Sequence, residues 1–394
     1  MTRGRRALLL VVVHAVVIQI ITFAMRPALS FAVLDLDGAP ILIGLLSAAF
    51  AVPALLLALP AGHAIDRIGE RPALVLGSIC VIAAAVVAAL SGDSLAALVA
   101  AAILLGIGHL LSVIGEQSIV AKESRRGNFD SRFGLYTFMV SLGQTLGPLL
   151  LALPGGSAST PPLELVFTIC AGFGAGLLGV SLYVRSAARM PVGHGGGILS
   201  TARMLLRTPG LPRALLAGSI VLSSVDLFLA YIPALGQERG LTAIVVSAML
   251  VARSLFSMLS RLLLGRIVAR LGRRNVLVWF ITASALALGA LAVPMPAAVL
   301  IMLSGVYGFA VGTCQPITMS WISELSVPGT RGLALSLRVA SNRLGQTVLP
   351  VAVGSFALAA GAPGVFLALG VLLIAAAWSS NAAGAVAGAD DGPE

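Results

Sequence analysis

Charged residues are scarce in this chain. Asp, Glu, Lys and Arg together make up 10% of the 394 residues, whereas hydrophobic residues make up 58%. The mean hydropathy is +1.04, which does not fit water-soluble domains. The composition therefore predicts a polytopic membrane protein.

Cysteine and histidine are also rare. The three cysteines, Cys80, Cys170 and Cys314, lie inside apolar runs, so no disulfide framework or thiolate metal site is indicated. The four histidines, at positions 14, 63, 109 and 194, are spread over loops and separate apolar runs. An enzyme would need a nucleophile and a base that converge, or a metal cluster. We therefore expect no enzyme, no metal and no cofactor.

Acidic residues are outnumbered by basic ones, 15 to 25, which gives a net charge of +10. The basic residues form no continuous face, so we expect no nucleic-acid partner. Instead, 19 of the 25 fall in every second loop between apolar runs. By the positive-inside rule, this predicts that both termini are cytoplasmic, which requires an even number of spans.

The apolar runs predict twelve helical spans. A secretory signal is an alternative for residues 3–25, but no small-residue cleavage site follows, so we interpret this stretch as the first span. The predicted spans are 7–34, 40–62, 72–91, 95–119, 130–153, 163–184, 213–236, 241–264, 275–293, 297–322, 331–356 and 361–380.

The loop between the second and third spans has a distinctive pattern. From Gly62 to Pro72 it reads Gly-His-Ala-Ile-Asp-Arg-Ile-Gly-Glu-Arg-Pro. It resembles the signature loop of the major facilitator superfamily, Gly-x-Leu-Ala-Asp-Arg-x-Gly-Arg-Arg, from which Ala64 and Glu70 depart. The matching residues are Gly62, Asp66, Arg67, Gly69 and Arg71.

This resemblance implies an all-α membrane protein with twelve transmembrane helices in two pseudo-symmetric six-helix bundles, working by alternating access. It also implies that Asp66 holds a cytoplasmic gate shut through an arginine and a helix N-terminus, where a carboxylate is favoured by the helix dipole. The alternative is that Asp66 is an ordinary solvated loop charge.

Two motifs recur at nearly the same offset. Gly62–Pro72 recurs 203 residues later as Gly265–Asn275, with Ala269 at the place of Asp66, and Leu142–Pro148 recurs 202 residues later as Leu344–Pro350. This indicates duplication of a six-helix unit. The expected segments are an N-terminal bundle (1–184), a cytoplasmic linker (185–212), a C-terminal bundle (213–380) and a disordered tail (381–394).

Several spans carry polar side chains along one face. The resemblance implies that the first, fourth, seventh and tenth spans line a central cavity. His109 and His14 could also relay protons near neutral pH, although an intramembrane histidine is as often a packing residue. The polar residues of the four spans are Gln19, Thr22, Arg26 and Ser30; His109, Ser112 and Glu116; Ser219, Ser223 and Asp226; and Tyr307, Gln315 and Thr318.

Arginines deep in the spans each cost roughly 2.5–3.5 kcal/mol on insertion scales, so they must face protein or water. They outnumber the buried acids Asp226 and Glu116, which favours an anionic solute. Alternatively, they pair with those acids or reach the membrane surface. The set is Arg26, Arg253, Arg338 and Arg343, with Asn342 beside the last two.

Asp226 is the acid expected nearest the middle of the membrane. If it meets Arg253 or Arg343 in one conformation and loses that partner in another, it would bind and release a proton during transport. The alternative is a permanent pair that only holds helices together.

The fifth span carries Gly143, Gly147 and Pro148. These resemble the antiporter motif of drug-efflux branches of the family, although Leu151-Ala152 stand where that motif continues with glycines. Those branches also carry an arginine in the fourth span, which this chain lacks at residues 101–105. The alternative is a close helix contact of the Gly-x-x-x-Gly type.

These observations predict a secondary transporter in a bacterial inner membrane. No Gly-x-x-x-x-Gly-Lys loop is present, so an ion or solute gradient would drive it. We expect proton-coupled efflux of a small amphipathic or anionic solute by a monomer in the lipid bilayer. Proton-linked uptake of an organic anion is the alternative. Two further hypotheses come from other functional classes: a membrane sensor that does not transport, and an intramembrane enzyme.

Overall fold

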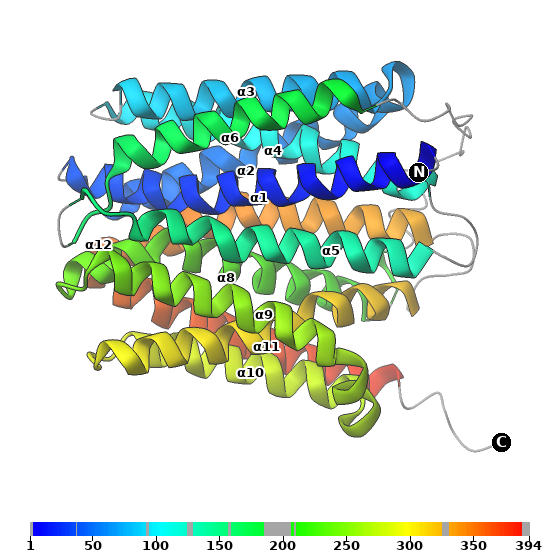
Figure 1. Ribbon diagram of the computed structural model, residues 1–394. Coiled ribbons are helices and arrows are strands. Elements are labelled where there is room, and N and C mark those ends of the chain that lie inside the picture. The colour runs from blue at the N-terminus through cyan, green and yellow to red at the C-terminus, as the bar shows by residue number, and fades with distance from the viewer. Residues whose placement is uncertain are drawn as a thin grey trace. The chain divides into compact units, whose positions relative to one another are not determined.

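A computed structural model describes residues 3–36, 38–91, 94–123, 129–156, 159–184, 206–208, 210–324 and 331–387. All regular secondary structure in these ranges is helical (Figure 1). Helices are the expected solution in hydrocarbon, because each satisfies its own backbone hydrogen bonds. The elements are α1 (Arg3–Asp35), α2 (Ile41–Ile68), α3 (Glu70–Ser91), α4 (Leu95–Glu123), α5 (Phe129–Leu146), the 3₁₀ helix η1 (Gly147–Ala152), α6 (Leu163–Tyr183), α8 (Leu211–Glu238), α9 (Ala243–Leu271), α10 (Arg273–Leu291), α11 (Ala297–Glu324) and α12 (Arg331–Ala387).

The helix α12 comprises two spans. Its 57 residues would extend about 85 Å as one straight helix, far more than the roughly 30 Å of a hydrocarbon core. The backbone leaves the helical region at Ala360 and at Gly361, where φ is 62°. Within the described residues, the predicted twelve-span all-helical fold is therefore confirmed.

The fifth span is not one continuous α-helix, as the sequence pattern had predicted for residues 130–153. The α-helix ends at Leu146 and a 3₁₀ helix follows from Gly147. Pro148 lacks a backbone N–H and cannot continue the α-helical hydrogen-bond ladder, so the chain tightens into 3₁₀ geometry.

The repeated loop motif has the same backbone in both copies. Gly69 separates α2 from α3 with φ of 94°, and Gly272 separates α9 from α10 with φ of 76°. Positive φ is readily adopted only by glycine, which explains why the motif needs a glycine at this point. The two glycines stand 203 residues apart, which is the offset of the sequence repeat.

The chain forms two compact units. Unit 1 comprises Met1–Val192 and Leu229–Val251, and unit 2 comprises Gly193–Phe228 and Ala252–Glu394. In unit 1, α1 packs against α4, α5 and α6, and α3 packs against α4 and α6 (Figure 1). In unit 2, α10 packs against α11 and α12. Most of the predicted linker and residues 388–394 of the predicted tail lie outside the described residues.

Glycines allow close helix contacts at equivalent places in both units. A Cβ atom on Gly106 of α4 would collide with the carbonyl oxygen of Phe50 in α2. The same atom on Gly308 of α11, 202 residues later, would collide with the carbonyl oxygen of Arg253 in α9. The duplication found in the sequence is thus repeated in the helix packing.

The glycines of the fifth span also face a helix backbone. A Cβ on Gly143 would collide with the Val16 carbonyl oxygen of α1, and a Cβ on Gly147 would lie 2.7 Å from the Ile20 carbonyl oxygen. This geometry supports the interpretation of Gly143-x-x-x-Gly147 as a close helix contact.

This contact predicts different outcomes for two glycines of α5. Gly143→Ala should destabilise the protein by about 1–3 kcal/mol, because the added methyl must displace the α1 backbone. Gly134→Ala is the matched control, since a Cβ there would meet nothing within 4 Å. Equilibrium unfolding in detergent micelles measures both variants. Equal stability of the two would contradict the close α1–α5 contact.

Candidate functional site

Three helices of unit 1 bring the polar residues of the first and fourth spans together. Gln19 of α1 donates through Nε2 to His109 Nε2 of α4 at 3.2 Å, and Gln144 Nε2 of α5 donates to Gln19 Oε1 at 3.4 Å. The His109 ring also lies 5.6 Å from the Phe50 ring of α2. The sequence predicted Gln19 and His109 as pathway residues, and the structure joins them directly.

Arg26 lies two turns after Gln19 on α1 and is 8% exposed. Its guanidinium lies over the Phe50 ring, 4.5 Å from the ring centre. Such a contact contributes about 2 kcal/mol or more when it is desolvated, which offsets part of the cost of burying the charge. Arg26, Ser30, Ser47 and Phe50 line a cavity of about 10 Å³, room for roughly one water molecule.

In unit 2, a glutamine connects an acid to a base. Gln346 of α12 donates through Nε2 to Asp226 Oδ2 of α8. Arg343 Nη1 in turn donates to Gln346 Oε1 at 3.1 Å. Asp226 and Arg343, which the sequence analysis predicted as a possible pair, are therefore brought together through the Gln346 amide, which was not among the predicted pathway residues.

Arg253 of α9 is almost completely buried, with 2% of its surface exposed. Its Nη2 donates to Ser254 Oγ at 2.6 Å. Nearby, the hydroxyls of Tyr307 and Ser224 are 2.8 Å apart. Both Arg253 and Asp226 lie close enough to Tyr307 for their charges to act on its hydroxyl.

The other predicted residues of unit 2 are less connected. Asn342 is 6% exposed, and its Oδ1 has no hydrogen-bond partner among the described residues. Arg338 is half-buried, and its Nε likewise lacks a partner within the described part of the chain. Gln315 is half-buried and accepts through its backbone carbonyl from Thr318.

Glu116 lies apart from the Gln19–His109 pair, although the sequence places it on the same face of α4. Its described hydrogen-bond partners are His14 at 2.6 Å and Tyr136 at 2.9 Å, and neither is an arginine. The sequence could not have paired His14 with Glu116, which are 102 residues apart on different helices.

The predicted gating motif spans the end of α2 and the start of α3. Gly62 is in the last turns of α2, Gly69 makes the break and Arg71 is exposed on α3. The side chains of Asp66 and Arg67 lie outside the described residues, so the gating role of Asp66 remains a prediction.

Glu70 departs from the family motif and is completely buried. It binds Lys122 Nζ at 2.6 Å and accepts from Ser118 Oγ at 3.0 Å, both on α4. The acid stands in the first turn of α3 and the base in the last turn of α4, so each charge is also favoured by its helix dipole. The sequence analysis counted Lys122 among the basic loop residues that indicate topology. Its contact with Glu70 indicates a second role, in holding α3 against α4.

Pro148, the last residue of the fifth-span motif, accepts a hydrogen bond through its carbonyl oxygen. The donor is Ser247 Oγ, at 2.6 Å within unit 1. The 3₁₀ turn leaves this carbonyl available to a side chain because the α-helical ladder has ended before it.

The geometry so far describes a multi-pass helical membrane protein with duplicated units and buried polar groups in each. The family model of the Major Facilitator Superfamily matches residues 11–224 and again residues 214–387. The chain therefore belongs to the Major Facilitator Superfamily. No curated protein sequence matches it.

Solved structures agree with this assignment. A variant of the nucleoside transporter NupG has a TM-score of 0.81 at 14% identity, over 95% of this chain and 99% of that chain. The xylose transporter XylE from E. coli has a TM-score of 0.75 at 16% identity, over 96% and 95%. The human organic anion transporter MFSD10 has a TM-score of 0.68 at 19% identity, over 96% and 100%. These similarities show the fold, and with the family they indicate a transporter and not an enzyme.

The Glu70–Lys122 pair leads to a stability prediction. Lys122→Met should destabilise the protein by about 3–5 kcal/mol, because it removes the cation that binds a completely buried carboxylate. Glu70→Gln combined with Lys122→Met should recover part of this loss, since no unpaired charge remains. Arg270→Met, at an exposed position of α9, is the control. If Lys122→Met unfolds at the same denaturant concentration as this control, the pair does not stabilise the α3–α4 contact.

Proposed function

We propose that this protein exports a small amphipathic or anionic organic solute in exchange for protons. The observation that carries the proposal is Arg26, a cation that is 8% exposed and stacked on Phe50 inside a predicted span. A buried arginine in a membrane is costly and is therefore a candidate for solute binding.

The chemistry of Arg26 favours a carboxylate or a similar oxyanion. The aromatic ring occupies the flat face of the guanidinium, so hydrogen bonds are made from its edge, where five N–H donors match planar oxyanions. Ser30 and Ser47 in the same cavity add hydroxyls. Leu29, Leu46, Ala102 and Leu105 give the same cavity an apolar wall. Because the cavity holds about one water molecule in this structure, we expect an amphipathic solute to bind in a conformation in which it is wider.

Unit 2 contributes a second kind of polar group. The buried Oδ1 of Asn342 accepts no hydrogen bond from the described residues, and an unsatisfied buried acceptor is costly. A hydrogen-bond donor that reaches this acceptor within unit 2 would remove that cost.

The driving force in this proposal is the proton gradient, with Asp226 as a coupling group. Asp226 is linked to Arg343 through Gln346, so a shift of one side chain would change the charge that the carboxylate meets. Proton-linked uptake of an organic anion would use the same groups in the opposite direction. Transport assays in vesicles of known orientation separate the two directions.

Arg26 is tested by ligand-dependent stability. An anion that binds the folded protein should raise the apparent unfolding temperature, whereas sugars and cationic drugs should not. Arg26→Gln should abolish the anion effect, and Arg213→Gln, at an exposed position of α8, should retain it. Stabilisation of Arg26→Gln by the same anions as the wild type would remove Arg26 from the site.

A second experiment distinguishes a role of Asp226 in proton coupling from a role in helix packing. Asp226→Asn should abolish proton-driven flux of an anion found in that screen, while anion exchange across the vesicle membrane continues. A carboxylate that only holds α8 against α12 would instead lower expression and stability together when replaced. Normal flux with a normal pH dependence in the variant would exclude both roles.

We also propose that the protein is a monomer in a bacterial inner membrane with both termini in the cytoplasm. The support is the arrangement of basic residues in alternate loops. A cysteine introduced at Gly384 should resist an impermeant thiol reagent in intact cells and react after the cells are broken. Labelling in intact cells would reverse the proposed orientation.

A further inference from the structure

Unit 1 contains a buried hydrogen-bond network that the proposed solute site does not use. His14 of α1 lies between Glu116 of α4 and Ser181 of α6, with its Nδ1 2.6 Å from Glu116 Oε1 and its Nε2 3.0 Å from Ser181 Oγ. Tyr136 of α5 donates to the other carboxylate oxygen at 2.9 Å, and Ser78 of α3 lies 3.0 Å from Ser181. Five helices meet here, and both members of the His14–Glu116 pair are 0% exposed.

The serine hydrogen bonds constrain where protons can lie. Ser78 donates to the Leu74 carbonyl at 2.8 Å, and Ser181 Oγ lies within hydrogen-bond distance of two carbonyls, that of Leu177 at 2.9 Å and that of Leu74 at 3.4 Å. When the Ser181 hydrogen is directed to either carbonyl, its Oγ accepts from His14, and Nε2 of the imidazole then carries a proton.

With Nε2 protonated, the short contact between His14 and Glu116 needs a second proton. Two bare lone pairs facing each other at 2.6 Å would repel, whereas a shared proton makes this a short, charge-assisted hydrogen bond. With that proton the pair has no net charge, which suits a dry site. Without it, the pair would be a single buried anion, which is costly in such a site. The proton can therefore leave only when water or a cation reaches the pair.

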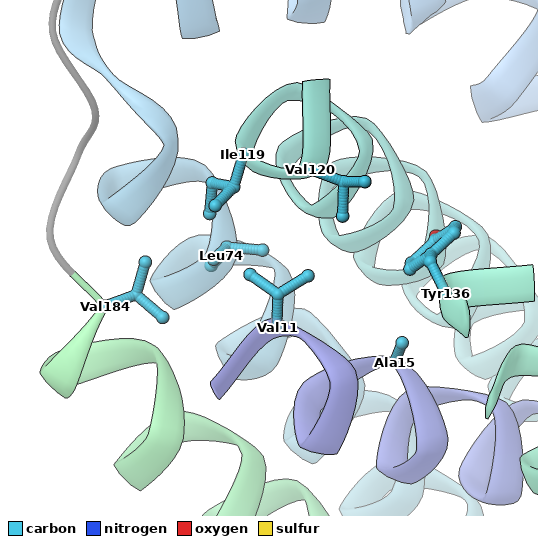
Figure 2. Close-up of a cluster of buried hydrophobic side chains, with 7 residues drawn as sticks. All are labelled: Val11, Ala15, Leu74, Ile119, Val120, Tyr136 and Val184. Carbon is cyan, nitrogen blue, oxygen red and sulfur yellow. The ribbon is translucent and has the colours of Figure 1, made fainter. Parts of the chain in front are cut away.

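An apolar layer separates this pair from the nearest helix ends. Val11 lies one turn before His14 on α1, Ile119 and Val120 lie one turn after Glu116 on α4, and Leu74 lies one turn before Ser78 on α3. Val184 follows α6 directly. Figure 2 shows these side chains converging with Ala15 and the Tyr136 ring from α1, α3, α4, α5 and the end of α6. We call these seven residues the apolar seal.

Several other titratable groups on the surrounding helices have described partners of their own or lie at the surface. Glu70 of α3 and Lys122 of α4 bind each other, His109 of α4 binds Gln19, and Tyr183 of α6 is 70% exposed. Among the described residues, Tyr136 is therefore the titratable neighbour that hydrogen-bonds the pair.

We propose that His14 and Glu116 form a proton-binding site of unit 1, and that the apolar seal controls its exchange with water. The inference rests on the proposed proton coupling and names where a proton is held. Binding adds one H⁺ to the pair and takes its net charge from −1 to zero; release reverses this. Separation of the sealing helices would admit water, stabilise the bare carboxylate and let the proton go.

The bound proton can be observed by NMR of labelled histidine and glutamate side chains in the purified protein. Because no solute is added, the result does not depend on whether the protein transports. His14→Gln identifies the His14 signal. At pH 8 the wild type should show one proton shared between His14 and Glu116, in addition to the proton on His14 Nε2. Glu116→Gln should leave a neutral His14 ring at pH 8, whereas the control Glu70→Gln, which removes another buried carboxylate of unit 1, should not change His14. A neutral ring beside an ionised Glu116 in the wild type would overturn the proposal.

The seal is tested by opening it. Leu74→Ala should lower the fraction of protein that holds the shared proton at pH 8 and should make the His14 ring protons exchange faster, because the cavity admits water towards the pair. Leu98→Ala is the matched control, since Leu98 is equally buried in unit 1 but lies in the first turn of α4, away from the seal. Val120→Thr provides a milder opening with nearly the same side-chain volume if Leu74→Ala does not fold. A pair that keeps its proton unchanged in every folded seal variant would be a fixed structural link, and the proposed proton site would be excluded.

Discussion

The central constraint on this protein is that hydrocarbon offers no hydrogen bonds to a polar atom. The backbone meets this constraint by forming helices, and the side chains meet it by turning inward between helices. Glycines at Gly106, Gly143 and Gly308 let helix backbones approach closely. That close approach places polar side chains such as Gln19 and Gln144 within hydrogen-bond distance of each other. The same glycines therefore determine both how closely the helices pack and which polar side chains can hydrogen-bond.

The sequence predicted the fold well because spans in a bilayer have a fixed minimum length and clear polar breaks. Eleven of the predicted starts fall within about four residues of a helix start, and the break before the last span falls at Gly361. The 3₁₀ turn after Leu146 was missed even though Pro148 signalled it, because hydropathy does not distinguish helix types.

The pairings were predicted less well, because a polar stripe identifies a face of a helix but not the helix that it meets. The stripe of α4 divides in the structure, with His109 bound to α1 at Gln19 and Glu116 bound to α1 at His14. Glu70 was noted only as a departure from the loop motif between the second and third spans, with no partner predicted, whereas it is buried against Lys122. Charge counts predict which side of the membrane a loop faces, but they do not show which of its charges are buried.

The two units share their packing and differ in their charges. Gly106 and Gly308 make equivalent contacts, yet the partner of the first is Phe50 and the partner of the second is Arg253. Gln144 and Gln346 occupy equivalent motif positions, yet the first binds an amide and the second an aspartate.

This difference leaves unlike charge balances in the membrane. In the described part of unit 1, Glu116 is bound to His14 and Glu70 to Lys122, and the buried Arg26 is stacked on Phe50. In the described part of unit 2, the arginines predicted to lie in spans include Arg253, Arg261, Arg338 and Arg343, and the acid predicted near mid-membrane is Asp226. Each buried cation raises the cost of insertion, and the anionic solute of the proposed function would offset part of that cost. An anionic solute would therefore meet a favourable potential from either unit, and its release would require a change in which charges surround it, such as a new partner for Asp226.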